Sequence, residues 1–286
     1  MKIVKTIPRL RQLVAAQRIK GRGIGLVPTM GALHQGHLSL IRLAKRTSEF
    51  VVVSIFVNPA QFGPKEDLKK YPRELQRDAA LCSTAGADLI FAPRVQDVYP
   101  DDYRTYVTVE RLTDGLCGAS RPGHFRGVAT VVSKLFNMVR PDVAVFGQKD
   151  AQQAAVIRQM ARDLDFPVRI VTGPIVREKD GLAMSSRNAY LTPAERAQAP
   201  ALYHALNLAK WLARSGRREA GMVKREMTKM LAREAPLGEV DYIGIVDNRT
   251  LEPVKKITGD TLVALAVRFS SARLIDNAVI RRPSNS

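Results

Sequence analysis

The sequence predicts an α/β fold, with a doubly wound parallel (Rossmann-like) sheet followed by a second, smaller α+β C-terminal domain. Apolar runs alternate with helix-like stretches through the first 175 residues, and this alternation is typical of parallel sheets with helices on both faces. Residues 50–57, FVVVSIFV, are almost wholly apolar, as expected of a strand covered on both sides. After residue 187, two helical patterns precede three strand-like runs, which predicts the second domain.

The first predicted domain spans residues 1–175. Ile7, Leu10, Leu13 and Val14 recur at helical spacing and predict a helix over residues 6–20. Further helices are expected over residues 38–47, 73–85, 128–139 and 151–164. Strands are expected over residues 24–28, 50–57, 88–92, 105–110, 143–146 and 168–171.

The second predicted domain spans residues 176–286. Thr192 suits the N-cap of a helix and Pro193 its first position, which predicts one long helix over residues 193–214. Another helix is expected over residues 219–234. The remaining expected features are strands over residues 240–246, 261–268 and 274–280, and a loose tail at residues 283–286.

Composition favours a cytoplasmic, globular protein without a membrane span. The chain is 45% hydrophobic and 25% charged, and no apolar run reaches the roughly 18 residues that a membrane-spanning helix needs. The first residues lack the apolar core of a signal peptide. Cys82 and Cys117 are too few for a disulfide framework, so we expect reduced thiols.

The formal net charge of +18 permits two interpretations. A basic protein can bind nucleic acid, but the Lys and Arg residues are spread along the chain and form no recognisable nucleic-acid module. A solvated basic surface is therefore favoured, and no nucleic-acid partner is expected. A salt-dependent gel shift separates the two interpretations.

The most informative motif is PTMGALHQGH, residues 28–37, which lies between an expected strand and an expected helix. A helix N-terminus presents unpaired N–H groups and a partial positive charge, so it suits phosphate. His34 and His37, three residues apart, can reach the same anion. A metal site is the alternative, but no nearby Cys or cluster of carboxylates completes one. The motif resembles the His-x-Gly-His signature of the nucleotidyltransferase superfamily.

Three further motifs have side chains suited to the same chemistry. In FVNPAQFG, Asn58 and Gln61 follow a strand and suit hydroxyls and a carboxylate. In VFGQKDAQQ, Lys149 suits phosphate and Asp150 suits ribose hydroxyls. The last motif, Met184-Ser185-Ser186-Arg187, offers hydroxyls and a guanidinium for a departing pyrophosphate, and resembles the Lys-Met-Ser-Lys-Ser loop of class I aminoacyl-tRNA synthetases.

Together with RPGHFRGV, residues 121–128, these motifs closely resemble the pantothenate synthetase (pantoate–β-alanine ligase) family over residues 1–195. The resemblance implies a two-step reaction. Pantoate and ATP form pantoyl adenylate and pyrophosphate, and the amine of β-alanine then displaces AMP. It also implies Mg²⁺ and a homodimer.

The resemblance assigns roles residue by residue. His37, His34 and Lys149 would be catalytic. Gln61 and Gln153 would hold pantoate, with Gln61 close to β-alanine as well, and Asp78 would hold magnesium. Asn58, Tyr71, Arg121 and His124 would lie near the pocket. ATP would be bound by Met30, Gly31, Ala32, Leu33, His34, Gln35, Gly36, His37, Gly147, Gln148, Lys149, Asp150, Val176, Met184, Ser185, Ser186 and Arg187.

Two departures and two alternatives accompany this interpretation. Ala151 stands where the family usually has tyrosine, and Ala60 where a bulkier residue is common, which concerns packing and affinity. Another adenylyl- or cytidylyltransferase, or a synthetase-like protein acting on tRNA, shares the histidine and serine motifs. Gln61, Gln153 and the GHFRGV segment favour pantoate. We expect the C-terminal domain to act as a lid that excludes water from the adenylate.

Overall fold

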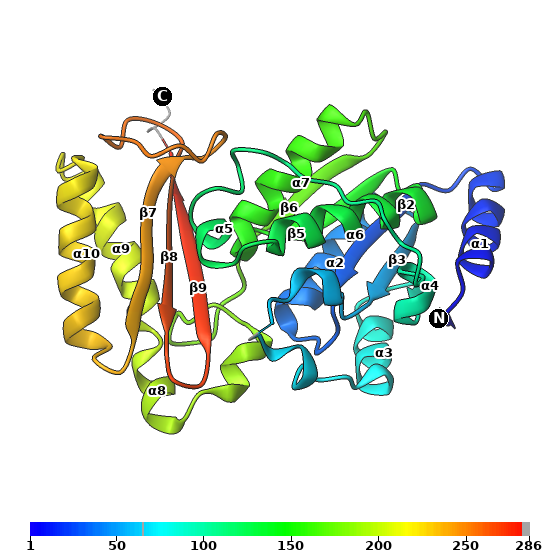
Figure 1. Ribbon diagram of the computed structural model, residues 1–286, viewed down its shortest axis with the longest axis horizontal. Helices are drawn as coiled ribbons and strands as arrows, with labels where there is room; N and C mark the ends of the chain where they lie inside the picture. The colour runs from blue at the N-terminus through cyan, green and yellow to red at the C-terminus, as the bar shows by residue number, and fades with distance from the viewer. Residues whose placement is uncertain (65, 282–286) are drawn as a thin grey trace. The chain divides into compact units, whose positions relative to one another are not determined.

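The computed structural model describes residues 1–64 and 66–281, which form two compact units (Figure 1). The first unit comprises Met1–Glu110, Arg121–Gln148 and Gln153–Pro174. The second contains the chain from Ile175 onward and two short segments, Arg111–Ser120 and Lys149–Gln152. The sequence pattern places both segments in the first domain, so their inclusion in the second unit is new. The tail predicted at residues 283–286 lies outside the described residues.

A parallel six-stranded sheet forms the centre of the first unit, in the order β1-β4-β3-β2-β5-β6. The predicted doubly wound sheet is thereby confirmed. The order reverses at β2, which pairs with β3 on one side and with β5 on the other. The strands are β1 (Lys2–Val4), β2 (Ile24–Thr29), β3 (Phe50–Ile55), β4 (Leu89–Phe91), β5 (Val143–Gly147) and β6 (Arg169–Gly173).

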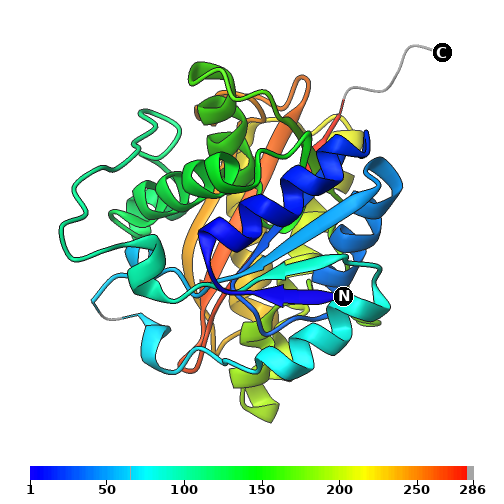
Figure 2. The same cartoon turned by 90° about the vertical axis from the view of Figure 1, so that its right-hand side faces the viewer.

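Helices cover both faces of this sheet (Figure 2). Because crossovers between parallel strands are right-handed, the reversal at β2 sends α1, α6 and α7 to one face and α2 and α3 to the other. Buried residues of α2 and α3 form one cluster with Val27, Val53 and Val145. The helices of this unit are α1 (Ile7–Ile19), α2 (Gln35–Thr47), α3 (Leu75–Thr84), α4 (Val95–Val98), α6 (His124–Val139) and most of α7 (Ala151–Asp163), with 3-10 turns η1 (Pro59–Gln61), η2 (Asp67–Lys69) and η3 (Gln148–Asp150) between them.

One strand predicted from the sequence is absent from the described structure, and one strand of the sheet was not predicted. The strand predicted at residues 105–110 is wrong, because that segment pairs with no strand among the described residues and is held by a side chain instead. The N–H of Val107 donates to the Thr130 hydroxyl on α6 over 3.0 Å. The edge of the sheet is formed by β1, whose three residues pair with β4 and are too few for a periodic pattern.

The second unit has an antiparallel sheet, β7-β8-β9, together with helices. The predicted α+β class and its three strands are confirmed. The single helix predicted over residues 193–214 is wrong, because Pro200 lacks the N–H that an uninterrupted helix would need there. The elements are α5 (Cys117–Ser120), η4 (Ser186–Tyr190), α8 (Pro193–Gln198), α9 (Ala201–Arg214), α10 (Ala220–Glu234), β7 (Glu239–Asp247), β8 (Thr261–Arg268) and β9 (Arg273–Ile280).

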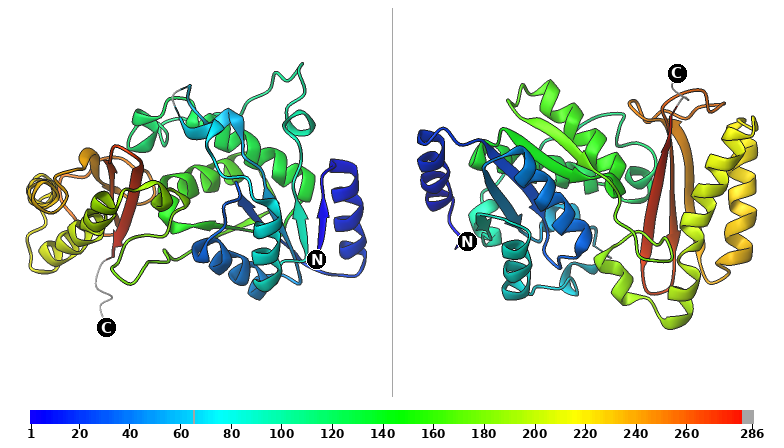
Figure 3. Two further views of the ribbon diagram at one scale, coloured as in Figure 1. Left: turned by 90° about the horizontal axis from the view of Figure 1, so that it is seen from below. Right: turned by 180° about the vertical axis from the view of Figure 1, so that it is seen from behind.

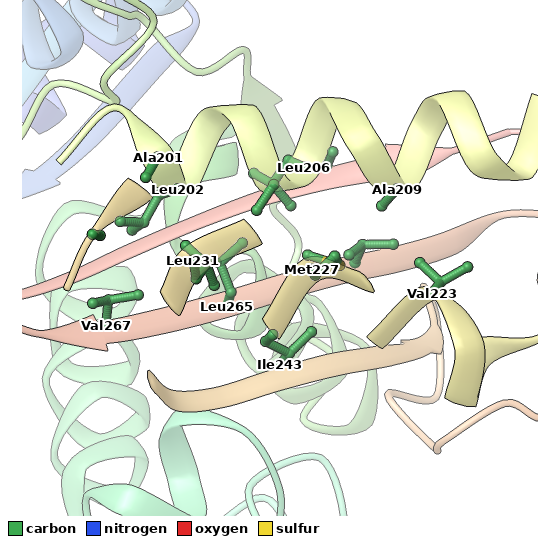
Figure 4. Packing of buried hydrophobic residues seen from close by; sticks show 14 of the residues in the cluster. Ala201, Leu202, Leu206, Ala209, Val223, Met227, Leu231, Ile243, Leu265 and Val267 are labelled. Carbon is green, nitrogen blue, oxygen red and sulfur yellow. The ribbon is translucent and has the colours of Figure 1, made fainter. Parts of the chain in front are cut away.

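Helices α9 and α10 lie along one face of the sheet of the second unit (Figures 3 and 4), and buried apolar residues lie on both faces. On one face, α9 and α10 pack Leu206 and Met227 against Ile243 and Leu265, all of them buried. Successive strand residues point to opposite faces. On the other face, Ala151 packs with Val246, Leu262 and Ala264, and Leu116 packs against them. The two inserted segments therefore close the face that the helices leave open.

A buried hydrogen-bond network joins α8 to the turn between β8 and β9. Glu195 is 3% exposed and accepts hydrogen bonds from the hydroxyls of Ser271 (2.5 Å) and Ser270 (2.7 Å). It also accepts from the N–H of Thr192, the N-cap that the sequence predicts. These bonds, chiefly those of Ser271 and Ser270, lower the pKa of Glu195 from 4.5 to about 2.

We predict that Glu195→Gln weakens the dependence of stability on acid pH. A lowered folded-state pKa contributes stability that is fully present above the unfolded-state value and is lost as pH falls through the folded one. The melting temperature of the wild type should therefore exceed that of the variant above pH 5. The difference should shrink between about pH 4.5 and pH 2. Thermal unfolding across this range measures it, and a constant difference would contradict the prediction.

Candidate active site

The candidate site residues of the first unit follow the carboxyl ends of β2, β3 and β5. Ligands of open α/β sheets bind outside these ends, at the point where the strand order reverses. The turn with His34 and His37 follows β2, and Gln61 lies in η1 after β3. Gly147 ends β5, Gln148 follows it in η3, and Gln153 lies in the first turn of α7. The sheet thus positions the histidine, glutamine and glycine motifs at one edge.

A buried carboxylate from α3 shapes the turn after β2. Asp78, which is 1% exposed, accepts hydrogen bonds from the N–H groups of Ala32 (2.9 Å) and Leu33 (2.8 Å). Gly31 and Ala32 both have left-handed backbone conformations, with φ values of 86° and 50°. A Cβ on Gly31 would lie 2.9 Å from Asp78 Oδ2, so only glycine lets the carboxylate approach.

The two histidines cap the helix that follows. The Nδ1 atom of His34 accepts from the N–H of Gly36 over 3.1 Å, and Nδ1 of His37 accepts from the N–H of His34 over 3.4 Å. The rings lie 4.1 Å apart between centroids. A ring nitrogen that accepts a hydrogen bond carries no proton, so in the neutral form each histidine bears its proton on Nε2. Both side chains can therefore donate from Nε2.

Gln61 is held in place by contacts with neighbouring segments. Its side-chain oxygen accepts from Asn58 Nδ2 over 3.1 Å, and its Nε2 lies 2.8 Å from Met30 Sδ. Asn58 also donates to the carbonyl of Gly127 on α6. A Cβ on Gly127 would come within 2.1 Å of the carbonyl oxygen of Ala60, so α6 touches the η1 turn directly. This close approach explains the second glycine of the GHFRGV motif, Gly127.

A charged network supports the backbone of Gln61. Arg121 pairs with both oxygens of Glu66, over 2.6 and 2.7 Å, and its Nη1 lies 3.1 Å from His124 Nε2. Nδ1 of His124 lies 2.9 Å from the carbonyl oxygen of Gln61. Burial raises the pKa of Glu66, but the hydrogen bonds and charge of Arg121 outweigh it, so the pKa is below its ordinary value. Sequence reasoning found Arg121 and His124 but not Glu66, because η2 and its flanking loop have no periodic pattern.

Lys149 belongs to the second unit, although its motif begins at the end of β5. It lies half-buried in η3, and its carbonyl accepts from Asn277 Nδ2 over 2.9 Å. Asp150 is exposed, and the two residues after it, Ala151 and Gln152, are buried in the second unit. Ala151 faces the apolar cluster on β7 and β8, so the departure from tyrosine concerns this packing.

The serine motif directly follows a short hairpin of the second unit. Arg177 and Ala183 form an antiparallel bridge, and the N–H of Met184 donates to the carbonyl of Val176 over 3.0 Å. Ser185 caps the following η4 turn, where its hydroxyl accepts from the N–H of Arg187. The structure thus brings together the predicted ATP-binding residues at positions 176 and 184–187.

The remaining predicted residues have mixed surroundings. Tyr71 is 5% exposed and packs edge-to-face on Phe62, with ring centroids 6.1 Å apart.

Among residues 1–64 and 66–281, no group of three or more His, Cys, Asp or Glu side chains is arranged to hold a metal ion. Both oxygens of Asp78 accept backbone hydrogen bonds in a buried position, and its assignment to magnesium stays a prediction. The structure supports a role for it in the turn.

Comparison with known proteins supports one family. A family model described as pantoate-beta-alanine ligase matches residues 2–279. A protein from Moorella thermoacetica named pantothenate synthetase is 57% identical over 280 residues, covering 98% of this chain and 99% of the relative. A crystal structure of pantothenate synthetase from Thermus thermophilus has a TM-score of 0.92 at 49% identity, covering 97% of this chain and 99% of that one.

A crystal structure of pantoate-beta-alanine ligase from Francisella tularensis, described as a complex with beta-gamma ATP and β-alanine, has a TM-score of 0.81 at 32% identity. It covers 98% of this chain and 97% of that one. Fold and site define an α/β enzyme with glycine-bearing turns at its strand ends. The chain belongs to the pantoate-beta-alanine ligase family. The family and the fold class that the sequence predicts are thereby confirmed.

We predict that Asp78→Asn lowers stability without changing the need for magnesium. The amide would turn an N–H toward a backbone N–H, leaving a buried donor unsatisfied at a cost of about 1–3 kcal/mol. Urea unfolding measures this loss, and a Mg²⁺ titration of pyrophosphate release measures the metal requirement. Glu74→Gln, at an exposed acid beside the same helix, is the control. Unchanged stability with a higher Mg²⁺ midpoint would instead make Asp78 a metal ligand.

Proposed function

We propose that this chain joins pantoate to β-alanine at the expense of ATP, through a pantoyl-adenylate intermediate, and releases AMP and pyrophosphate. Membership of the family supports the overall reaction. The single observation that carries the chemistry is the turn after β2. It places two histidine side chains and the N-terminus of α2 at the reversal point of the sheet.

The first step requires donors, since attack by the pantoate carboxylate on the α-phosphate increases negative charge on the phosphoryl oxygens. Preorganised donors at such a position are a large part of catalysis. His37 and His34, each with a proton on Nε2, are proposed to donate to these oxygens. The N–H groups at the start of α2 add to the favourable field. No protein nucleophile is needed, because the substrate carboxylate attacks.

The other assignments divide by substrate. Gln61 and Gln153, in the first unit, are proposed to hold pantoate, and Gln61 is proposed to contact β-alanine as well. Lys149 and Arg187, in the second unit, are proposed to neutralise the triphosphate. The lid role of the second unit stays a prediction. ATP is further assigned to the main chain around Gly31 and to the other ATP-binding residues named from the sequence.

Magnesium is proposed to arrive with ATP. This ion keeps several waters and binds through phosphates with one or two carboxylates, so a dedicated protein cage is not required. Asp78 holds the turn after β2 through two hydrogen bonds, and its role as a magnesium ligand stays a prediction.

We also propose that the enzyme acts in the cytoplasm. Cys82 and Cys117 are free and buried, which agrees with a reducing cytoplasm. Within the described part of the chain, no helix has the length and apolar character needed to span a bilayer.

The homodimer implied by the resemblance stays a prediction, and light scattering tests it. We propose no nucleic-acid partner, and the gel shift at physiological salt remains the test of the net charge of +18.

We predict that pyrophosphate is released from ATP only when pantoate is present, and that pantothenate forms only after β-alanine is added. The order follows from the need to activate the carboxylate before the amine attacks. A coupled pyrophosphate assay with each substrate omitted in turn measures it. Release that is equally fast without pantoate would overturn the substrate assignment.

We predict that His34→Ala and His37→Ala each slow adenylation by about 10²–10³-fold, as expected for the loss of one charge-stabilising donor. Single-turnover pyrophosphate release measures the step. Arg46→Ala, an exposed residue near the end of the same helix, is the control and should behave as wild type. Near-normal adenylation in either histidine variant would remove that histidine from catalysis.

A further inference from the structure

Strand β9 carries two adjacent polar residues, Asp276 and Asn277, which are each 3% exposed. Adjacent strand residues point to opposite faces of a sheet. Leu274 and Ala278, two positions either side of Asp276, pack on the helix-covered face, whereas Val279 packs on the face with Ala151. The side chain of Asp276 therefore lies on the helix-covered face of the sheet, and that of Asn277 lies on the opposite face.

Asn277 holds the lysine turn. Its Nδ2 donates to the carbonyl oxygen of Lys149 over 2.9 Å. The turn has further anchors in the same unit, because Ala151 packs in the apolar cluster and Gln152 makes three hydrogen bonds. Gln152 donates to the carbonyls of Leu112 and Gly115 and accepts from the N–H of Cys117. The backbone of Lys149 is therefore held by the hydrogen bond from Asn277 to its carbonyl and by the contacts of Ala151 and Gln152.

Asp276 holds the hairpin that leads into the serine motif. Both of its oxygens accept from Arg177, over 2.6 and 3.0 Å, and its side chain is 2% exposed. Arg177 also donates to the carbonyl of Gly181 at the tip of the hairpin. The N–H of Met184 closes the other end on Val176. The ion pair therefore fixes the direction in which the chain enters Ser185.

The two anchors are coupled directly. The N–H of Asn277 donates to Oδ1 of Asp276 over 2.8 Å, the same oxygen that accepts from Arg177 Nη2. Burial of polar groups is costly, and an apolar pair would pack a sheet equally well. A role in fixing neighbouring segments accounts for their presence better than a contribution to sheet stability.

We propose that Asp276 and Asn277 are positioning residues for adenylation, which hold the lysine turn and the serine loop at a fixed spacing on one strand. Both segments are then presented to the same triphosphate without having to be ordered by it. This inference rests on the proposed roles of Lys149 and of the loop at residues 184–187. Neither Asp276 nor Asn277 belongs to a motif that the sequence analysis singled out.

The test is Asn277→Ala, measured in the two half-reactions separately. Displacement of a reactive group by about 1 Å can cost up to about 10²-fold in rate, so we expect pyrophosphate release to slow by about 10–100-fold. The attack of β-alanine on supplied pantoyl adenylate should stay within about twofold of wild type, and the KM for pantoate should not change. If the alanine variant does not fold, Asn277→Ser, whose hydroxyl is too short to reach the Lys149 carbonyl, replaces it.

Glu195→Gln is the matched control, because it disturbs another buried polar network of the same unit that bonds neither segment. It should lower the melting temperature while leaving the ratio of the two half-reaction rates unchanged. If Glu195→Gln and Asn277→Ala change that ratio equally, the effect is one of stability, and the positioning role is overturned.

A double-mutant cycle with Lys149→Ala separates this inference from the function on which it rests. If Asn277 acts through Lys149, its substitution should cost less than about twofold once the lysine is absent. No loss of adenylation in Lys149→Ala would overturn the role of Lys149, and this inference with it. A slow Lys149→Ala enzyme combined with a fast Asn277→Ala enzyme, or two losses that multiply, would overturn the positioning role alone.

Discussion

The pair of hydrogen bonds from Ala32 and Leu33 to Asp78 is the constraint on which the first unit's site depends. Two consecutive left-handed residues are costly for a chain of L-amino acids, particularly where the second is alanine. A buried carboxylate that accepts both N–H groups offsets that cost. It also explains why glycine precedes the alanine, since any side chain at Gly31 would displace the carboxylate.

The orientation of the histidines follows from this turn. Once the chain enters α2 at a fixed angle, His34 becomes its N-cap and His37 occupies the third helical position. Each then directs Nδ1 to a backbone N–H, which leaves the proton on Nε2. A capping box made from two histidines thus has two effects: it satisfies N–H groups at the start of the helix, and it sets the tautomer of both rings. In most helices the N-cap residue is serine, threonine, aspartate or asparagine, which satisfies the N–H groups only.

The sequence predicted the parts of the structure that depend on local pattern. Strand β8 and helix α10 were found nearly to the residue, because apolar periodicity marks them directly. Residues 105–110 also alternate apolar with polar side chains, but they pair with no strand in the described part of the chain, and pairing is not a local property. The histidines and Gln61 were found from motifs. The contacts that place them were not, since Asp78 lies 46 positions from Ala32 and Arg121 lies 60 from Gln61.

The VFGQKDAQQ motif is divided between the two units. It reads as one continuous element, yet the chain passes from the first unit to the second between Gln148 and Lys149 and returns between Gln152 and Gln153. Lys149 therefore belongs with the serine loop, and Gln153 belongs with Gln61. This matches the proposed roles, in which Lys149 and Arg187 of the second unit neutralise the triphosphate and Gln61 and Gln153 of the first unit hold pantoate. The hydrogen bond from Asn277, together with the anchors at Ala151 and Gln152, ties the backbone of Lys149 to the second unit.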